Sequence, residues 1–245
     1  MTDRIAVGLH VGGVELELTI GVPSGPVRVV DLLPVFNKLN DTIVSLGVRD
    51  AELDGKTVSC RAGCGACCRQ MVPITLPEAG RLASLVDALP EPRRSEIRAR
   101  FERGVATLSR AGLLRQLRDL AAATPEERRQ VGLDYFSQQV ACPFLEDESC
   151  SIHPDRPMAC RDYLVTSPAS LCKSPSPDVE MVELPARVWS AVARLNQDAV
   201  RAGKLPWVPL LLALERASGQ PDAAEPRPAG EILRAVFDQI ASPPA

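Results

Sequence analysis

The sequence predicts a mainly α-helical protein with short β-hairpins and a small, irregular, metal-stabilised core decorated by helices. Three observations lead to this prediction. Several segments repeat apolar residues at spacings of three and four, strand-like alternation is confined to short stretches, and all eight cysteines lie in the middle of the chain. With 245 residues, 45% of them hydrophobic and 24% charged, the chain can bury a sizeable core.

The N-terminal segment, residues 1–57, predicts a β-hairpin followed by a helix. Gly12 and Gly13 separate two runs of alternating apolar residues, as in a hairpin with one buried face. Asp31 can cap the helix that follows, and Pro34 falls harmlessly in its first turn. The buried stripe of this helix is expected to consist of Leu32, Phe36, Leu39, Ile43 and Leu46.

The middle segment, residues 58–176, contains two signals for the start of a helix. Thr75 with Glu78, and Thr124 with Glu127, have the spacing of a capping box. We therefore expect one helix to begin after each threonine.

Other parts of this segment predict a long helical stretch and a short hairpin. Residues 91–123 are expected to be helical, with a fringe of arginines that we interpret as a solvated face rather than a docking surface. The stretch "ACPFLEDESCSIH" predicts two short strands around a turn from Glu146 to Ser149. The residues expected to face inward from the helical stretch are Ile97, Phe101, Val105 and Leu108.

The C-terminal segment, residues 177–245, predicts further helices after a Pro/Ser-rich loop at 167–177. A helix is expected around Val188, and another is expected to start near Trp207. Residues 219–230 are rich in Ala and Pro and are predicted to be a linker. The first helix would bury Val188, Val192 and Leu195, and a final amphipathic helix would bury Ile232, Leu233, Val236, Phe237 and Ile240.

Charge and the N-terminal sequence indicate the partners and the compartment. A net charge of -3 predicts no general attraction to nucleic acid or to an anionic membrane, so an unidentified protein is the partner left to consider. The first twenty residues lack the uninterrupted apolar core of a signal peptide, and no apolar run of about 18 residues occurs. We therefore expect a cytoplasmic protein, in which thiols stay reduced.

The cysteines form two groups of four. The first group, spaced C-x3-C-x2-C-C in "CRAGCGACC", consists of Cys60, Cys64, Cys67 and Cys68. The second group consists of Cys142, Cys150, Cys160 and Cys172. Gly63 and Gly65 favour a loop over a continuous helix, so that backbone N–H groups can turn toward thiolate sulfur. Four arginines near cysteines would offset negative charge on sulfur: Arg61, Arg69, Arg156 and Arg161.

This pattern indicates a metal site held by the eight thiols. A disulfide scaffold would also explain the even number of cysteines, but the sequence has no secretory signal of the kind that accompanies one. Taken alone, the second group of cysteines is as typical of buried core residues as of metal ligands. Zinc and an iron–sulfur cluster both stay open. Only Cys64 and Cys67 have the spacing of a zinc knuckle, whereas the adjacent Cys67 and Cys68 suit a polynuclear cluster. We expect the two groups, more than 70 residues apart, to meet in one metal-bearing core.

Two longer stretches, together with the cysteines, resemble a known family. "ITLPEAGRL" and "CPFLEDESCSIHPDRPMACRDY" make residues 58–172 similar to the YkgJ family of cysteine-cluster proteins, a zinc- or iron-chelating domain in which eight cysteines recur. His153 stands where this family commonly has Tyr. We interpret it as a hydrogen-bonding substitute, with a ninth metal ligand as the alternative. The family's RPxxCR element falls on Arg156, Pro157, Cys160 and Arg161.

Two classes of function stay open. One is a metal-binding protein with a structural, electron-transfer or partner-serving role. The other is a metal-dependent enzyme of methylase-like or redox type, because some members of the resembled family are described as flagellin lysine methylases. A radical-SAM reading of C-x3-C-x2-C is disfavoured, since helices rather than alternating strands and helices follow it. No nucleotide loop, nucleophile elbow or H-E-x-x-H helix is present, so no catalytic residue is predicted.

Overall fold

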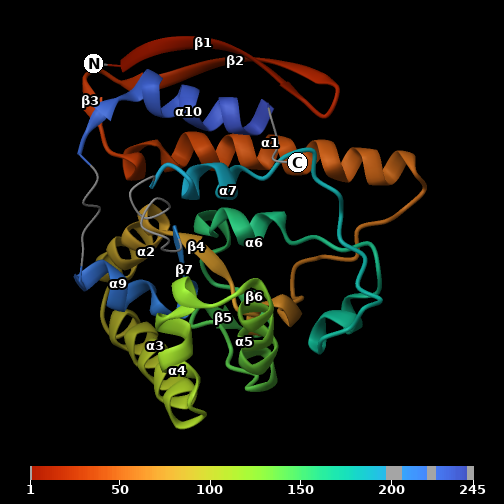
Figure 1. Cartoon of the computed structure of the whole chain (residues 1–245), viewed down its shortest axis with the longest axis vertical. Coiled ribbons are helices and arrows are strands. Elements are labelled where there is room, and N and C mark those ends of the chain that lie inside the picture. The colour runs from red at the N-terminus through yellow and green to blue at the C-terminus, as the bar shows by residue number, and fades with distance from the viewer. Residues whose placement is uncertain (1, 197–205, 220–224, 242–245) are drawn as a thin grey trace.

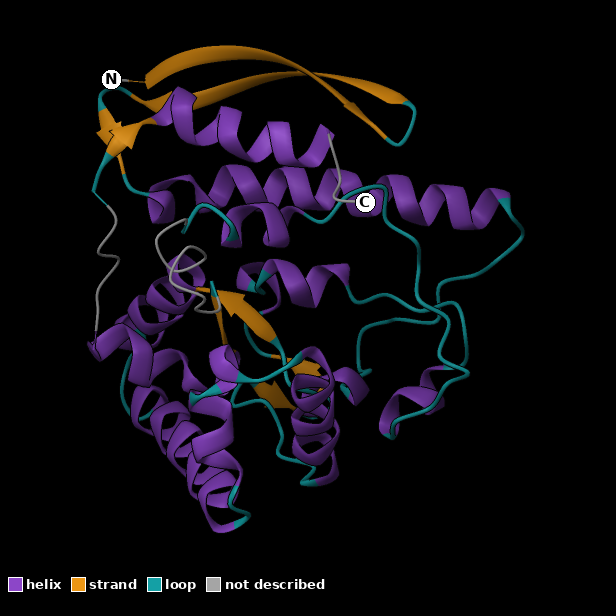
Figure 2. Cartoon of the chain, in the orientation of Figure 1, coloured by secondary structure: helices purple, strands orange, loops and turns teal. Residues whose placement is uncertain are grey.

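A computed structural model describes residues 2–196, 206–219 and 225–241 of the chain. Helices dominate these residues and the strands form antiparallel pairs, which confirms the predicted mainly helical fold with hairpins (Figure 2). Within the described ranges, no helix combines the length and the apolar character needed to cross a membrane.

The helices and strands have the following bounds. The helices are α1 (Leu33–Leu53), α2 (Leu76–Ala88), α3 (Arg93–Arg110), α4 (Leu113–Arg118), α5 (Pro125–Ser137), α6 (Met158–Asp162), α7 (Val188–Ala193), α9 (Ala213–Gly219) and α10 (Ala229–Ala241). The 3-10 turns are η1 (Val29–Leu32), η2 (Ala66–Arg69), η3 (Leu120–Ala122), η4 (His153–Asp155), η5 (Ala169–Lys173) and η6 (Leu210–Leu212). The paired strands are β1 (Thr2–Val11) with β2 (Val14–Pro23), β3 (Pro26–Val27) with β8 (Arg227–Pro228), β4 (Pro73–Thr75) with β7 (Trp207–Pro209), and β5 (Leu145–Glu146) with β6 (Ser149–Cys150).

One half of the molecule is a layered unit built from both ends of the chain. The hairpin β1–β2 covers α10, and α10 lies over α1 and α7 (Figure 1). Alternation decides which side faces inward: Leu9 and Ile20 are buried against the helices, whereas His10 and Glu15 pair with each other on the exposed face. The predicted hairpin is confirmed.

The other half packs α2 to α5 and α9 around the small sheet β4–β7 (Figure 1). Its core contains Phe101 of α3 and Phe144, whose rings meet edge to face with centroids 5.5 Å apart. Capping boxes at Thr75 and Thr124 open α2 and α5, as the sequence predicts. This second core supports the cysteine-bearing loops from one side.

The helical stretch 91–123 is broken where the sequence analysis expected it to be continuous. α3 ends at Arg110, and α4 starts at Leu113 after Gly112, whose φ of 73° is left-handed. Glycine adopts this conformation without the steric cost that a Cβ brings, so Gly112 both stops one helix and starts the next.

Two expectations for the C-terminal segment are wrong because long-range strand pairing overrides local pattern. Trp207 begins strand β7, which pairs with β4, and the helix α9 starts only at Ala213. In the predicted linker, residues 220–224 lie outside the described residues. Residues 227–228 form strand β8 against β3, and α10 begins at Ala229.

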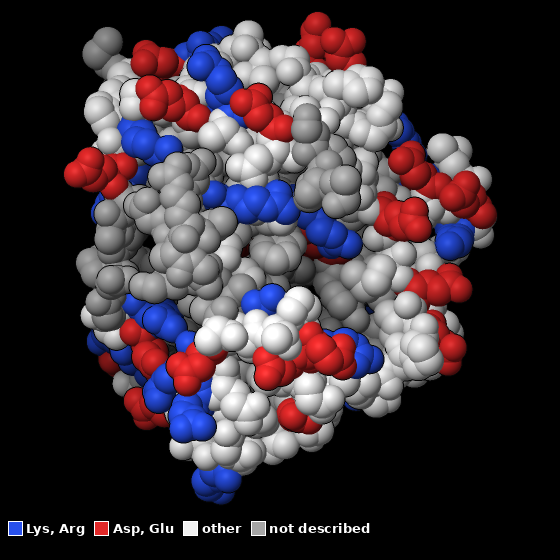
Figure 3. Space-filling model, viewed as in Figure 1, with Lys and Arg blue, Asp and Glu red and all other residues white. Residues whose placement is uncertain are grey.

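The arginine fringe of α3 is an ion-paired surface. Arg93 and Arg100 both contact Glu146, Arg98 contacts Asp87, and Arg94 lies 2.8 Å from Glu91. Basic and acidic side chains are interspersed on the face in Figure 3. Each arginine named here therefore already has a carboxylate partner within the molecule.

Candidate metal centre

The first cysteine group lies on a loop, as its glycines predict. Gly63 has a φ of 80°, and the chain then makes the 3-10 turn η2, which contains Cys67 and Cys68. The start of the loop is tied to a distant segment, since Ser59 N donates to the carbonyl of Val165 over 2.9 Å.

Gly65 allows this loop to lie directly on the hairpin β5–β6. A Cβ at Gly65 would lie 2.5 Å from Leu145 Cδ1 and 2.9 Å from Glu148 Oε2, closer than real side chains approach. Arg69 fastens the contact by donating to both carboxylate oxygens of Glu148, over 2.6 and 3.1 Å, and to the carbonyl of Gly65 over 3.0 Å.

The backbone joins the two cysteine groups at one further point. Cys142 N donates to the carbonyl of Cys68 over 2.7 Å. Leu145 pairs with Cys150 across the short hairpin β5–β6, so the hairpin that contacts the first loop also positions Cys150. A backbone hydrogen bond therefore places Cys142 next to the first group, and Cys150 lies on the hairpin that Gly65 approaches.

Cys160 is positioned by the buried N-terminus of α2. Glu78 is only 5% exposed, and its Oε1 accepts from Met158 N over 2.8 Å, two residues before Cys160. Its other oxygen accepts from Thr75 N over 2.8 Å and from Thr75 Oγ1 over 2.9 Å. Arg161 extends the support by reaching Asp41 of α1 at 2.9 Å.

Cys172 lies on the opposite side of the first loop. It is 5% exposed on η5 and forms a small cluster with Ala66 and Val165, against which Cys60 and Cys64 pack. The turns η2 and η5 are in contact. Cys172 is thus the member of the second group that shares a cluster with Cys60 and Cys64.

Electrostatic coupling places Cys60, Cys64, Cys67 and Cys172 together. Burial is the main reason why the pKa of Cys60 and of Cys172 is raised. Charge on Cys67 and Cys64 raises the pKa of Cys60 further, and charge on Cys60, Cys67 and Cys64 does the same for Cys172. Cys60 and Cys64 pack against the cluster that contains Cys172, and Cys67 lies on η2, which contacts η5, so these four thiols form one neighbourhood.

A second neighbourhood contains Cys142, Cys150 and Cys160. Burial raises the pKa of Cys142 to about 12, and it also raises the pKa of Cys150 and of Cys160. Charge on Cys67 adds to the rise in all three, and charge on Cys150 adds to the rise in Cys142 and Cys160. Cys67 therefore belongs to both neighbourhoods.

The largest influence on the pKa of Cys67 comes from its neighbour in sequence, Cys68. Its hydrogen bond with Cys68 is the first cause that raises its pKa, followed by burial. Arg156 acts in the opposite direction on Cys60, Cys67 and Cys150, as expected for an arginine that offsets charge on sulfur. Arg69 and Arg161 instead hold the scaffold through Glu148 and Asp41.

The chemistry of these donors fits zinc or iron. All eight cysteines lie in the described residues and are free thiols. Among those residues, no group of three or more His, Cys, Asp or Glu side chains is placed so that it could hold a metal ion as it stands. The cysteines therefore suit these metals by the chemistry of their sulfur atoms and by their proximity to one another. Soft thiolates are the ligands that zinc and iron–sulfur clusters share.

Some features of the site could not be identified from residue types alone. His153 lies exposed on η4, where the charge of Arg156 lowers its pKa. Tyr163 and Gln70 were not singled out, yet Gln70 Nε2 donates to Tyr163 Oη over 3.0 Å beside Cys172. The buried role of Glu78 was also missed: its capping box was recognised, but not its bond to Met158.

Comparison with known proteins assigns this region to a family. A family model described as "Putative zinc- or iron-chelating domain" matches residues 59–181, about half of the chain. No curated protein and no solved structure matches the chain. The matched residues contain all eight cysteines and the supports described above except Asp41 of α1. The chain therefore belongs to the CxxCxxCC family of zinc- or iron-chelating domains.

Proposed function

We propose that all eight cysteines hold one metal centre, either an iron–sulfur cluster or zinc, as thiolates within a metal-binding domain at residues 58–176. The observation that carries this proposal is the contact between the two groups, which lie more than 70 residues apart in sequence: Cys142 N donates to the carbonyl of Cys68, and Cys60 and Cys64 pack against the cluster that contains Cys172. Because thiolates must be deprotonated and gathered to bind, the free energy of metal binding becomes part of the free energy of folding.

The position of Cys67 favours a polynuclear centre or two close metal ions over one isolated zinc ion. A mononuclear zinc site uses four ligands, whereas eight thiols occur here with one of them in both neighbourhoods. Within this proposal the iron–sulfur cluster is the first assignment and zinc is the second. The narrower assignment to the YkgJ family rests on the "RPMACR" stretch that contains Cys160.

The role that we propose for this centre is structural, electron-transferring or partner-serving, in the cytoplasm. A metal-dependent enzyme of methylase-like or redox type is the second candidate. One observation favours it: Cys172 lines a cavity of about 700 Å³, so a small molecule there would lie beside the centre.

Anaerobic purification of the full chain, with metal and acid-labile sulfide analysis and a visible spectrum, tests the proposal. An iron–sulfur cluster would give iron and sulfide in similar amounts and a brown colour, and zinc would give colourless protein with bound zinc. Protein that contains neither metal would contradict the proposal.

A cysteine variant tests whether the two groups share one centre. Cys160→Ala should lower metal content and reduce hydrogen-exchange protection at residues 60–80, although Cys160 lies outside that range. Ser170→Ala is the matched control, because Ser170 lies exposed on η5 and the change also leaves an alanine. Unchanged metal content and protection in Cys160→Ala would assign the metal to the first group alone.

A further inference from the structure

A cavity of about 700 Å³ lies between α5 and the chain that follows η5. This volume falls within the range of small-molecule sites in proteins. Most of its wall is apolar and comes from Met71, Leu133, Phe136, Pro175, Pro177 and Val179. A ligand with an apolar body would therefore bury that body here with a favourable change in free energy.

One end of the cavity is formed by polar groups that adjoin the cysteines. Cys172, Tyr163 and Gln70 all line it. Gln70 Nε2 donates to Tyr163 Oη over 3.0 Å. This bond holds Gln70 and Tyr163 against each other, so that a ligand meets a preformed polar surface at this end.

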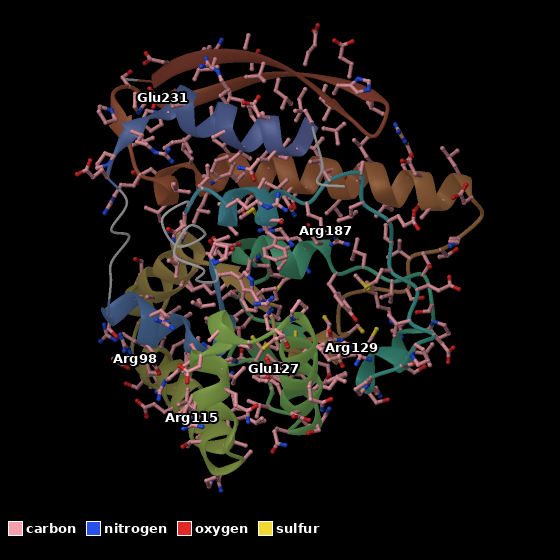
Figure 4. All side chains as sticks on the ribbon, viewed as in Figure 1. Arg98, Arg115, Glu127, Arg129, Arg187 and Glu231 are labelled. Carbon is pink, nitrogen blue, oxygen red and sulfur yellow. The ribbon has the colours of Figure 1, made fainter. Side chains whose placement is uncertain are left out.

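The charge of the wall comes from Arg129 alone among the described residues that line the cavity. Arg129 lies on α5, and its side chain is 66% exposed (Figure 4). Its nearest carboxylate is Glu126, 3.5 Å away and exposed, which does not line the cavity. Arg129 is a basic side chain with no Asp or Glu beside it among the described residues of the wall, so this part of the cavity favours a ligand that carries negative charge.

Gly132 leaves the cavity open but makes the helix α5 less stable than alanine at this position would. A glycine inside a helix is less favourable than alanine, and no positive φ requires one here. Packing does not require it either, since a Cβ would lie 3.7 Å from Met71 Cε, an ordinary contact distance. A longer side chain at this position would enter the space between α5 and Met71.

We propose that this cavity binds a small carboxylate with an apolar body, with the carboxylate at Arg129 and the body alongside Cys172. That such a ligand lies beside a metal centre rests on the proposed function. Binding in the cavity itself rests only on the wall, the charge and the missing side chain described above.

Calorimetric titration of the full-length protein as purified tests the proposal with 3-phenylpropionate, 4-methylpentanoate and the uncharged amide of each. At least one acid should bind with a Kd below about 1 mM, and about twofold to fivefold more tightly than its amide, as expected for an exposed ion pair. If neither acid binds, or if the amides bind as tightly as the acids, the proposal is wrong.

Two pairs of variants locate the binding. Arg129→Gln should remove the preference for acid over amide, whereas Arg128→Gln, next to it on α5 and outside the cavity wall, should keep the preference. Gly132→Leu should weaken binding of acid and amide about tenfold by occupying the cavity. Its control is Gly80→Leu on α2, where a Cβ meets nothing within 4 Å. Unchanged binding in Gly132→Leu would show that the ligand lies elsewhere.

Metal analysis of the same samples keeps the two proposals separate. Metal-free protein that still binds the acid would support the cavity and refute the proposed function, whereas metal-replete protein that binds no acid would refute only the cavity. In protein that contains an iron–sulfur cluster, saturation with the acid should shift the visible thiolate-to-iron absorption band, and Gly132→Leu should lose that shift at the same acid concentration. An unchanged band on saturation would overturn the placement beside Cys172.

Discussion

The two capping boxes share one sequence pattern and differ in what they support. At α5, Thr124 Oγ1 accepts from Glu127 N over 3.2 Å, and Glu127 Oε2 accepts from Thr124 N over 2.7 Å, at the surface (Figure 4). At α2, the same exchange between Thr75 and Glu78 is buried, and Glu78 also accepts from Met158 N. Burial turns a local helix signal into a tertiary contact with the segment that carries Cys160.

The pKa values of the two glutamates record this difference. Burial raises the pKa of Glu78, although its hydrogen bonds act in the opposite direction. Glu127 is exposed, and its hydrogen bond with Thr124 N lowers its pKa. The hydrogen bonds of the motif therefore favour the charged form of both side chains, and burial outweighs them only at Glu78.

The largest difference is expected when each glutamate is truncated. Glu78→Ala leaves Met158 N–H and Thr75 N–H buried without their acceptor, so it should lower the free energy of unfolding by about 3 kcal/mol. Glu127→Ala loses one exposed box and should cost much less. Urea denaturation of both variants measures this, and equal losses would show that the tertiary contact of Glu78 contributes nothing.

The second largest difference between the two capping boxes is expected in how well the protein retains its metal. Glu78→Gln keeps the size of the side chain but places an amide donor against backbone donors, which should loosen Met158 and, two residues later, Cys160. We expect this variant to release its metal to a chelator severalfold faster than the wild type. Glu127→Gln, far from any cysteine in sequence, serves as the control and should release metal at the wild-type rate. Identical rates in both variants would contradict a role of Glu78 in positioning Cys160.

Opposite pH dependences are the third expected difference. The pKa of Glu78 is raised in the folded state, so its contribution to stability is present below the unfolded pKa and is lost as the pH rises through the folded pKa. The pKa of Glu127 is lowered, so its contribution is present above the unfolded pKa and is lost as the pH falls. Unfolding free energies relative to each Gln variant, measured from about pH 3 to pH 7, should change in opposite directions. Parallel changes would show that burial does not control Glu78.

Much of the fold could be predicted because its signals are local. The alternation around Gly12 and Gly13, and the threonine–glutamate spacings, act within one turn or one strand, and each gave the element that was expected. Strand β7 could not be predicted in this way. The run from Trp207 to Leu214 is apolar enough for a helix, and only pairing with Pro73–Thr75, far away in sequence, makes its first residues a strand.

The candidate site shows the same limit. Spacing indicates that the cysteines belong together, but not that Cys67 is coupled to both neighbourhoods, because that depends on how η5 and the β5–β6 hairpin lie against the first loop. The cavity was missed for a similar reason. Gly132 is an ordinary helical glycine in sequence, and its open side becomes visible only when Met71 is placed opposite it.

The smallest expected difference comes from replacing each threonine with serine. Serine keeps the hydroxyl that caps the helix, so Thr124→Ser, at an exposed position, should leave stability unchanged within error. Thr75 is 0% exposed, and Thr75→Ser removes a buried methyl group, which should lower the free energy of unfolding by about 1 kcal/mol. Because both variants keep the box, a difference between them measures packing around the buried box alone. If Thr75→Ser were as stable as the wild type, packing around Thr75 would contribute nothing. The difference in stability between the two boxes would then come only from the hydrogen bonds of Glu78, which Glu78→Ala measures.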